Sequence, residues 1–448
     1  ESIEHRHRQP TPERTEALAC TRCRADAGAL TVHNWLDRHG YSLNLVAVLL
    51  WPLSLLFGLA VRVRRFLYLQ GLLRSEAFSV PVIVVGNINV GGAGKTPLVA
   101  RLVELLRQVG YRPGVVSRGY GGQSVQWPRT VTADSDPGQV GDEPVLLAQR
   151  CRCPVVVDPD RVAAAWALLA THRCNVIISD DGLQHYRLQR DIEIAVVDGF
   201  RRFGNAACLP AGPLREPPSR LKSVDFVVGN GAARGREYLM TLHGDVAVNL
   251  ADPYVSSALS NFRQTMVHAM AGIGDPGRFF DHLRHARLRF IEHPFPDHHP
   301  FQPADLRFRE DLPVLMTEKD AIKCRSFASD NCWYVPVSAQ CDPEFDEALL
   351  KRLAMVAMAK GIRREQTDTG RRHRAPSRLP THDEVNANGQ ETAGDSGMPG
   401  QQGPADVRQD QAGIDLPGEP IGLPGSGWHS GDAGSRGAAA DGRGGERE

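Results

Sequence analysis

The stretch that decides the fold is VPVIVVGNINVGGAGKTPLV, residues 80–99. It opens with a short β-branched apolar run, VPVIVVG, of the kind that is buried in a parallel sheet. A glycine-rich loop follows directly. The next segment, TPLVARLVELLRQVG, has apolar residues at helical spacing, and Gly110 is a stop signal at its end. A strand, a glycine loop and a helix in this order predict a phosphate-binding loop for a nucleotide.

The loop departs from the usual Walker A pattern, because Asn89 stands where the first glycine is expected. The remaining glycines still allow backbone N–H groups to curve around phosphate oxygens at a helix N-terminus. A lysine in this position neutralises the β- and γ-phosphates, and the hydroxyl beside it ligates Mg²⁺. The alternative is a glycine-rich turn with a chance Lys-Thr, which the flanking strand and helix disfavour. The predicted ATP-binding residues are Gly91, Gly92, Ala93, Gly94, Lys95 and Thr96.

A second half of the site is predicted in NVIISDDGLQH, where Asp180 and Asp181 end an apolar run. Carboxylates at the C-terminal end of a strand suit a hydrated Mg²⁺ ion. The alternative is a simple acidic turn, since Asp-Gly is a common turn pair. Beside the glycine loop we favour the metal site, and which aspartate contacts the metal stays open.

Further apolar runs, PVVVD, IEIAVVDG and VDFVVGN, alternate with helical stretches such as DRVAAAWALLA. This alternation predicts a doubly wound α/β domain with a parallel sheet. LMTEKD, residues 315–320, has some likeness to the guanine-binding Asn-Lys-x-Asp of GTPases. Its Lys319 and Asp320 are adjacent and no Asn precedes them, so the spacing fails and ATP is the expected nucleotide.

The 448-residue chain has zero formal net charge, which gives no indication of a nucleic-acid partner. Its nine cysteines, an odd number in a long chain, do not indicate a disulfide framework and favour a reducing compartment. Residues 1–30 are predicted to be a polar disordered extension. Residues 359–448 are predicted to be a disordered Gly/Pro-rich tail, because they hold too few apolar side chains to offset the entropy of ordering.

Residues 41–61 form a run of 21 uncharged residues that Arg62, Arg64 and Arg65 follow. The run is long for a buried core helix and lacks the cleavage site of a signal peptide. It could span a bilayer, or lie in one leaflet with its arginines at anionic headgroups. Pro52 and the polar residues in the run favour one leaflet. Residues 31–75 are therefore predicted to be a membrane-associated helical segment with the arginines on the cytoplasmic side.

Eight blocks, in order, resemble the tetraacyldisaccharide 4'-kinase family of lipid A synthesis. They are PLSLLFGLAVRVRRFLY, VPVIVVGNINVGGAGKTPLV, RPGVVSRGYGG, GDEPVLLA, DDGLQH, LPAGPLREP, HPFPDHHPF and VLMTEKDAIKC. The resemblance covers about residues 31–355. The family usually has Thr at the positions of Asn89 and Ala93, a departure that leaves the backbone role of the loop intact.

The resemblance implies transfer of the ATP γ-phosphate to the 4'-hydroxyl of a tetraacyldisaccharide 1-phosphate. The partners would be this lipid-linked disaccharide and inner-membrane lipids, at the cytoplasmic face of the bacterial inner membrane, with no nucleic acid and no obligate protein partner. It also implies a P-loop kinase core over residues 76–230 and a smaller C-terminal α/β lobe over residues 231–358.

The resemblance assigns residue roles too. Asp142 in GDEP matches a general base, and His298 in PDHH matches its partner. From the residues alone, Asp142 could instead cap the helix that follows it. The rival function is a P-loop ATPase or GTPase that drives partner or metal-site assembly, which does not explain the apolar run. The predicted catalytic residues are Asp142, His298 and Lys95, and the predicted metal ligands are Thr96, Asp180, Asp181 and Glu216.

Overall fold

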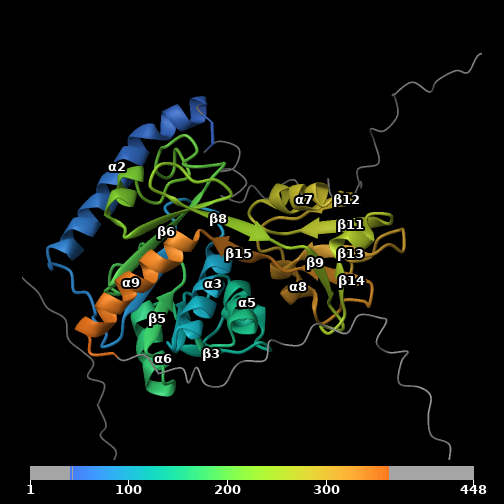
Figure 1. The fold of residues 1–448 in the computed structure, drawn as a ribbon. Coiled ribbons are helices and arrows are strands. Elements are labelled where there is room, and N and C mark those ends of the chain that lie inside the picture. Colours follow the sequence, from blue (N-terminus) through green and yellow to red (C-terminus); the bar gives the residue numbers. More distant parts are fainter. Residues whose placement is uncertain (1–40, 43, 363–448) are drawn as a thin grey trace, which may run out of the picture. The chain divides into compact units, whose positions relative to one another are not determined.

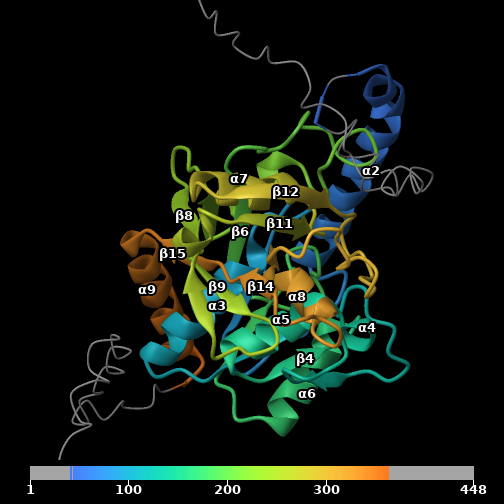
Figure 2. The same cartoon turned by 90° about the vertical axis from the view of Figure 1, so that its right-hand side faces the viewer.

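Two β-sheets carry the part of the chain that the computed structural model describes, residues 41–42 and 44–362 (Figure 1). The predictions for residues 1–30 and for the tail beyond 362 lie outside this part. Figure 2 gives the view at a right angle, with the second sheet and its helices in front.

The first sheet has nine strands in the order β15-β8-β7-β6-β1-β5-β2-β4-β3. The seven strands from β8 to β4 pair in parallel, and β15 and β3 close the edges as antiparallel strands. This confirms the predicted doubly wound parallel sheet. The strands are β1 (Val82–Gly86), β2 (Pro113–Ser117), β3 (Arg129–Val131), β4 (Val155–Val157), β5 (Val176–Ser179), β6 (Ile192–Asp198), β7 (Phe226–Asn230), β8 (Tyr238–His243) and β15 (Ser338–Cys341).

Helices cover both faces of this sheet (Figure 1). Leucines at helical spacing, such as Leu98 and Leu102, bury one side of α3 in a core shared with α5 and α9. On the other face, Leu168 of α6 and the half-buried Phe57 of α2 pack in a second core. The helices are α2 (Leu45–Leu69), α3 (Lys95–Gln108), α4 (Pro137–Val140), α5 (Asp142–Cys151), α6 (Arg161–Thr171) and α9 (Pro343–Ala359).

The second sheet has six strands in the order β10-β9-β14-β13-β11-β12 and cores of its own around Leu283 and Met316. Its four strands from β14 to β12 are parallel. The elements are β9 (Val246–Asn249), β10 (Ser256–Ala258), β11 (Met266–Ala271), β12 (Arg289–Pro294), β13 (Val314–Thr317), β14 (Cys332–Val335), α7 (Pro276–His285) and α8 (Glu318–Cys324), with a 3₁₀ turn at Leu259–Phe262. A further 3₁₀ turn, Pro218–Ser223, precedes β7 of the first sheet.

Sheet membership does not follow the lobe boundary that we placed between residues 230 and 231. Strand β8 continues the first sheet, and β15 and α9 return to it after the second sheet is complete. Phe345 of α9 is fully buried in the core of the first sheet. The sequence could not indicate this return, because a strand's own residues do not specify which sheet supplies its partner.

Helix α2 presents a narrow polar and small-residue stripe to the protein and a wide apolar surface away from it. The side chain of Asn44 caps its N-terminus. Ser54 donates a hydrogen bond to the carbonyl of Cys208 at 2.7 Å, and Gly58 lies against the same loop. Within the described residues, α2 is the one helix long and apolar enough to cross a membrane. The exposed apolar side chains of α2 include Leu45, Val48, Leu49, Trp51, Leu53, Leu55, Leu56, Leu59, Val63, Phe66 and Leu69.

Candidate active site

The glycine loop runs from the end of β1 to the start of α3, as the sequence predicts. Gly91 and Gly94 have φ angles of +101° and +91°, a region that side chains disfavour. A Cβ on Gly94 would lie 2.5 Å from the amide nitrogen of Asn230, which itself donates to the carbonyl of Ala93 at 3.1 Å. Asn230 at the end of β7 therefore holds the loop in a shape that leaves the N-terminal end of α3 available to bind an anion.

The predicted acidic pair follows β5, the neighbour of β1. Asp180 is 1% exposed, and neither of its carboxylate oxygens has a hydrogen-bond partner among the described residues. Burial and the negative charges of Glu143 and Asp181 raise its pKa to about 7. A buried carboxylate without donors is costly unless a cation occupies the site. Its bare oxygens beside the loop fit the Mg²⁺ ion that a P-loop kinase needs.

Asp181 lies among positive charges. Its carboxylate is 3.4 Å from Lys95 Nζ and 3.0 Å from Arg215 Nη1, and its carbonyl accepts from Arg161 at 2.6 Å. Burial raises the pKa of Asp181, but Lys95 and Arg215 outweigh burial and hold this pKa well below its ordinary value. Lys95, Arg161 and Arg215 thus converge at the loop, as a polyphosphate requires.

The structure brings Asp142 and His298 together although 156 positions separate them. His298 Nδ1 donates to Asp142 Oδ2 at 3.1 Å, and its backbone has a strained φ of +59°. Burial raises the pKa of Asp142, but the hydrogen bond from His298 and the charge of Lys319 outweigh it and lower the pKa to about 2. The same hydrogen bond raises the pKa of His298. The N-cap of α5 is Gly141, so N-capping does not explain Asp142.

Lys319 is a residue that sequence reasoning missed. It comes from α8 of the second sheet, and its ammonium group is 3.7 Å from Asp142 and 3.4 Å from both Glu143 and Asp297. Burial lowers the pKa of Lys319, but these carboxylates outweigh burial and raise it. Lys319 lies in LMTEKD, which fails as a guanine-binding motif and belongs to one of the blocks that carry the resemblance, but neither observation assigned a role to Lys319. Asp320 of the same stretch is fully buried and accepts from the backbone N–H of Gly272.

The second sheet also contacts the loop directly. Arg278 of α7 pairs with Asp198 at the end of β6 at 3.1 Å and reaches the carbonyl of Gly92 at 3.5 Å. The sequence carried no signal for Arg278, because it lies on an ordinary amphipathic helix. Residues of both sheets therefore surround one site.

Glu216 is placed differently from the other predicted ligands. It is 1% exposed and accepts hydrogen bonds from Gln184 Nε2, at 2.9 Å, and from the hydroxyl of Tyr186. Gln184 also donates to the carbonyl of Asn87 at the start of the loop. Among the described residues Glu216 does not contact Lys95 or the acidic pair. Its role as a metal ligand stays a prediction, and so does that of Thr96, the second residue of α3.

Comparison with known proteins identifies the family. The sequence model of the tetraacyldisaccharide-1-P 4'-kinase family (LpxK) matches residues 46–354. The chain belongs to this family. Tetraacyldisaccharide 4'-kinases from Nitrosococcus oceani and Alkalilimnicola ehrlichii are 55% and 52% identical to it. The alignments cover 72% and 68% of this chain and 95% and 91% of those proteins.

The LpxK family also includes a solved structure with the same fold. A crystal structure of an "apo" form LpxK from Aquifex aeolicus in complex with ATP matches with a TM-score of 0.59 and 27% identity. The match covers 69% of this chain and all of that one. The resemblance stated from sequence blocks is therefore confirmed.

The Asp142–His298 pair gives a prediction on the pH dependence of stability. The pKa of His298 is raised above 6.5 in the folded state, so its contribution is fully present below pH 6.5 and is lost as pH rises through the raised value. We expect the melting temperature to differ more between wild type and His298→Gln at pH 6 than at pH 8.5. Asp142 is ionised across this range. Differential scanning fluorimetry measures the difference.

The control is His243→Gln, at an exposed histidine that ends β8. The effect of His243→Gln on the melting temperature should not be larger at pH 6 than at pH 8.5. A difference between wild type and His298→Gln that is equal at both pH values would contradict the charged hydrogen bond.

Proposed function

We propose that this protein transfers the γ-phosphate of ATP to the 4'-hydroxyl of a tetraacyldisaccharide 1-phosphate at the cytoplasmic face of the inner membrane. Membership of the 4'-kinase family supports this proposal. The observation that carries it is the placement of the hydrogen-bonded Asp142–His298 pair in one site with Lys95 and the buried Asp180. The rival partner-assembly NTPase needs no such pair, and nothing in the site favours it.

The glycine loop and Lys95 bind the β- and γ-phosphates. Lys95 balances the charge that develops on the transferring group, and Arg161 and Arg215 add positive potential at the same place. Asp180 and the hydroxyl of Thr96 would hold Mg²⁺, which would neutralise charge on the phosphate oxygens. Asp181 keeps Lys95 and Arg215 oriented through its ion pairs.

Asp142 binds the 4'-hydroxyl of the substrate. Its carboxylate is ionised at neutral pH, and His298 fixes its direction. As the 4'-oxygen bonds to the γ-phosphorus, the bond from that phosphorus to the β-phosphate oxygen breaks, and the hydroxyl proton passes to the Asp142 carboxylate. Phosphoryl transfer has a loose transition state, so orientation matters more than basicity in this step.

The decisive experiment follows ³²P from [γ-³²P]ATP into tetraacyldisaccharide 1-phosphate by thin-layer chromatography. We expect label in the lipid in the presence of Mg²⁺ and none when EDTA removes the metal. ATP hydrolysis without labelled lipid would contradict the proposed acceptor.

The metal role of Asp180 can be tested in the same assay. We expect Asp180→Asn to raise the Mg²⁺ concentration for half-maximal activity by about tenfold or more, because a direct charged ligand is lost. The control is Asp158→Asn, since Asp158 is also a buried carboxylate that follows a parallel strand, two strands from Asp180. An unchanged Mg²⁺ requirement in Asp180→Asn would exclude Asp180 as a ligand.

The apolar surface of α2 supports insertion into one leaflet. A stripe of α2 packs on the protein, so this helix lies against the kinase core with its leucines outward. We expect Leu55→Glu combined with Leu56→Glu to weaken binding to phosphatidylcholine vesicles by at least about 10²-fold. Vesicle sedimentation measures this.

A matched control is Val125→Glu combined with Tyr254→Glu, because these side chains are 96% and 98% exposed outside α2. The control should bind vesicles like the wild type. Unchanged sedimentation of the α2 variant would show that another part of the chain is the anchor.

A further inference from the structure

A cavity of about 780 Å³ lies at the C-terminal end of α2, apart from the active site. The chain segments that line it, residues 71–76, 189–191 and 225, precede strands β1, β6 and β7. The glycine loop and the acidic pair follow the ends of β1 and β5. These strands are parallel, so these lining segments and the glycine loop lie at opposite ends of the strands, about 17 Å apart for strands of five residues. On the side of the cavity that faces the active site, Tyr186 and Arg220 both contact Glu216.

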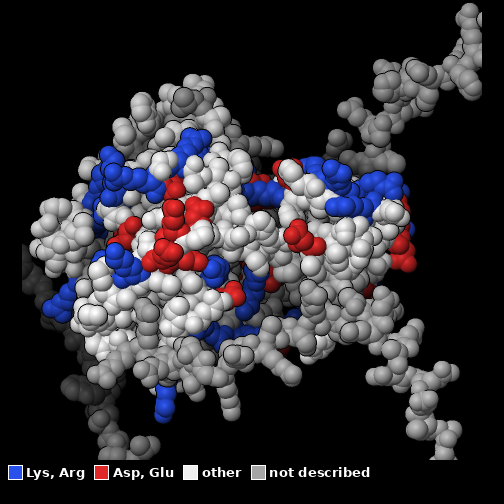
Figure 3. All heavy atoms as spheres, viewed as in Figure 1, with Lys and Arg blue, Asp and Glu red and all other residues white. Residues whose placement is uncertain are grey.

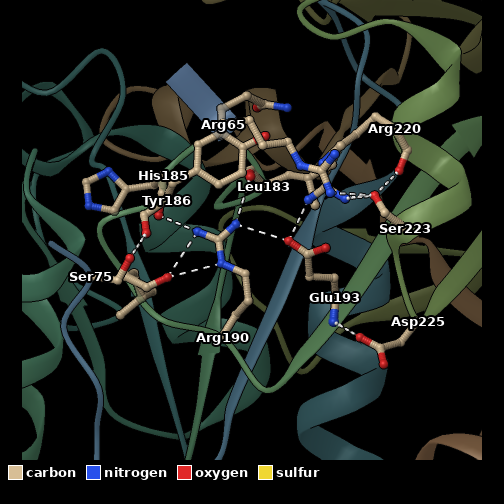
Figure 4. Close-up of polar contacts among 12 residues, drawn as sticks. Arg65, Ser75, Leu183, His185, Tyr186, Arg190, Glu193, Arg220, Ser223 and Asp225 are labelled. Atoms are coloured by element: carbon tan, nitrogen blue, oxygen red, sulfur yellow. Dashed lines mark hydrogen bonds and ion pairs between the residues drawn. The ribbon is translucent and has the colours of Figure 1, made fainter. Parts of the chain in front are cut away.

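The wall of the cavity is a buried polar network centred on Glu193. Arg190 and Arg220 both donate to Glu193, at 3.1 and 2.5 Å. Arg190 also donates to the carbonyls of Leu183 and Leu188. Figure 4 shows the two guanidinium groups directed at Glu193, with Arg65 and Ser223 beside Arg220. This network fixes the wall and engages all three guanidinium nitrogens of Arg190, whereas Arg220 Nε is buried without a hydrogen-bond partner among the described residues, 3.7 Å from Glu216.

The rim of the cavity, formed by Arg65, Arg74 and Glu76, carries unpaired positive charge. Arg65 donates to the hydroxyl of Ser223 at 2.8 Å, and Arg74 is exposed. Neither arginine pairs with a carboxylate in the part of the chain that the structure describes. The acids lining the cavity are mostly neutralised, because Lys360 pairs with Asp191 at 2.7 Å and Arg352 pairs with Asp225 at 3.2 Å.

Glu76 is the one lining carboxylate that lacks a cationic partner among the described residues. Two unpaired arginines against one unpaired glutamate leave the rim with an excess of one positive charge. That excess suits a singly charged phosphodiester.

The surroundings of the rim are those of a membrane surface. Leu69 lines the cavity and Leu72 follows three residues later; both are exposed, at 67% and 69%, and continue the apolar surface of α2. Figure 3 shows basic side chains gathered along the region that α2 occupies in Figure 1. A phosphate at the rim with acyl chains over the leucines matches both features.

We propose that this cavity binds the headgroup of an anionic glycerophospholipid, with its phosphate between Arg65 and Arg74 and its acyl chains along the end of α2. The inference rests on the membrane association proposed above and adds a second contact to it. The apolar surface of α2 inserts into the leaflet. The cavity makes the protein prefer anionic lipid and fixes the rotation of α2 about its axis on the membrane.

The test compares full-length protein on vesicles of phosphatidylcholine alone and on vesicles with 30% phosphatidylglycerol. Arg65→Gln combined with Arg74→Gln should reduce partitioning onto the anionic vesicles by about tenfold or more, with no change on neutral vesicles. The matched control is Arg152→Gln combined with Arg173→Gln, which removes the same charge from exposed positions outside the cavity. Kinase activity on detergent-dispersed substrate should be unchanged in both double variants.

If the control variant lost as much partitioning onto anionic vesicles, net charge alone would explain the effect, and the proposed site would be wrong. An equal loss on neutral vesicles would overturn it too, because the headgroup would then play no part. Inorganic phosphate at matched ionic strength should not release the wild type from anionic vesicles. Its release down to the neutral-vesicle level would assign the cavity to soluble phosphate and contradict the lipid. Failure of wild-type binding to neutral vesicles would count against the insertion of α2, while the phosphatidylglycerol increment still measures the cavity.

Discussion

Replacement of Lys95 by alanine should reduce phosphate transfer by about 10²- to 10³-fold or more, because it removes the cation that neutralises charge developing on the transferring group. The fold should persist. Lys95 is the first residue of α3, its apolar neighbours stay in place, and Asp181 keeps its ion pair with Arg215. The measurement is the initial rate of ³²P transfer, together with the melting temperature of each protein.

The control is Arg101→Ala on the same helix. Arg101 pairs with Asp346 of α9 at 2.6 Å, away from the loop. Its removal also takes one positive charge from α3 and should leave kcat near the wild-type value. Equal rates for Lys95→Ala and wild type would remove the glycine loop from the mechanism.

Asp142→Asn should lower kcat by about 10²- to 10⁴-fold, the usual contribution of a positioned proton acceptor. Nucleotide affinity should change little, since Asp142 lies with His298 rather than with Lys95. The amide has the size of the carboxylate but cannot accept the proton of the substrate hydroxyl. Steady-state kinetics give kcat, and equilibrium binding of a fluorescent ATP analogue gives the affinity.

The companion variant is Asp305→Asn. Asp305 pairs with His299, the neighbour of His298, at 3.1 Å and so forms a second Asp–His pair in the same loop. It should retain near wild-type turnover. If Asp142→Asn lowers the melting temperature but preserves kcat, the carboxylate is structural and the proposed base is wrong.

Local signals determined what the sequence could predict. The strand before the glycine loop, the loop itself and the acidic pair are contiguous patterns, and the structure brings Lys95 and Asp181 within 3.4 Å. The pairing of Asp142 with His298 had no local signal and came only from the resemblance. Lys319 and Arg278 stayed hidden because each lies on a helix of the second sheet, and nothing in their neighbouring residues indicates that this sheet reaches the loop.

The fold, too, could be predicted where the signal was local and not where it depended on contacts between distant parts of the chain. Alternating apolar runs were enough for a doubly wound sheet, yet the return of β15 and α9 to it was not predicted. The register and the partner of a strand depend on contacts between residues far apart in the sequence, such as Ala339 of β15 opposite Leu242 of β8. Glu216 was assigned a metal role only through the resemblance. Its two oxygens accept hydrogen bonds from Gln184 and Tyr186, and its role as a metal ligand stays a prediction.

The late return of the chain has a consequence for biogenesis. The edge strand β15 pairs with β8 across an insertion of about a hundred residues, and Lys360 at the end of α9 donates to the carbonyls of Phe78 and Val80, next to the first strand. During translation, the nucleotide-binding lobe therefore stays incomplete until the whole second sheet has left the ribosome. A message truncated after β14 would yield a nascent chain with an open sheet edge and an uncovered hydrophobic face, a substrate for chaperones and proteases rather than a smaller kinase.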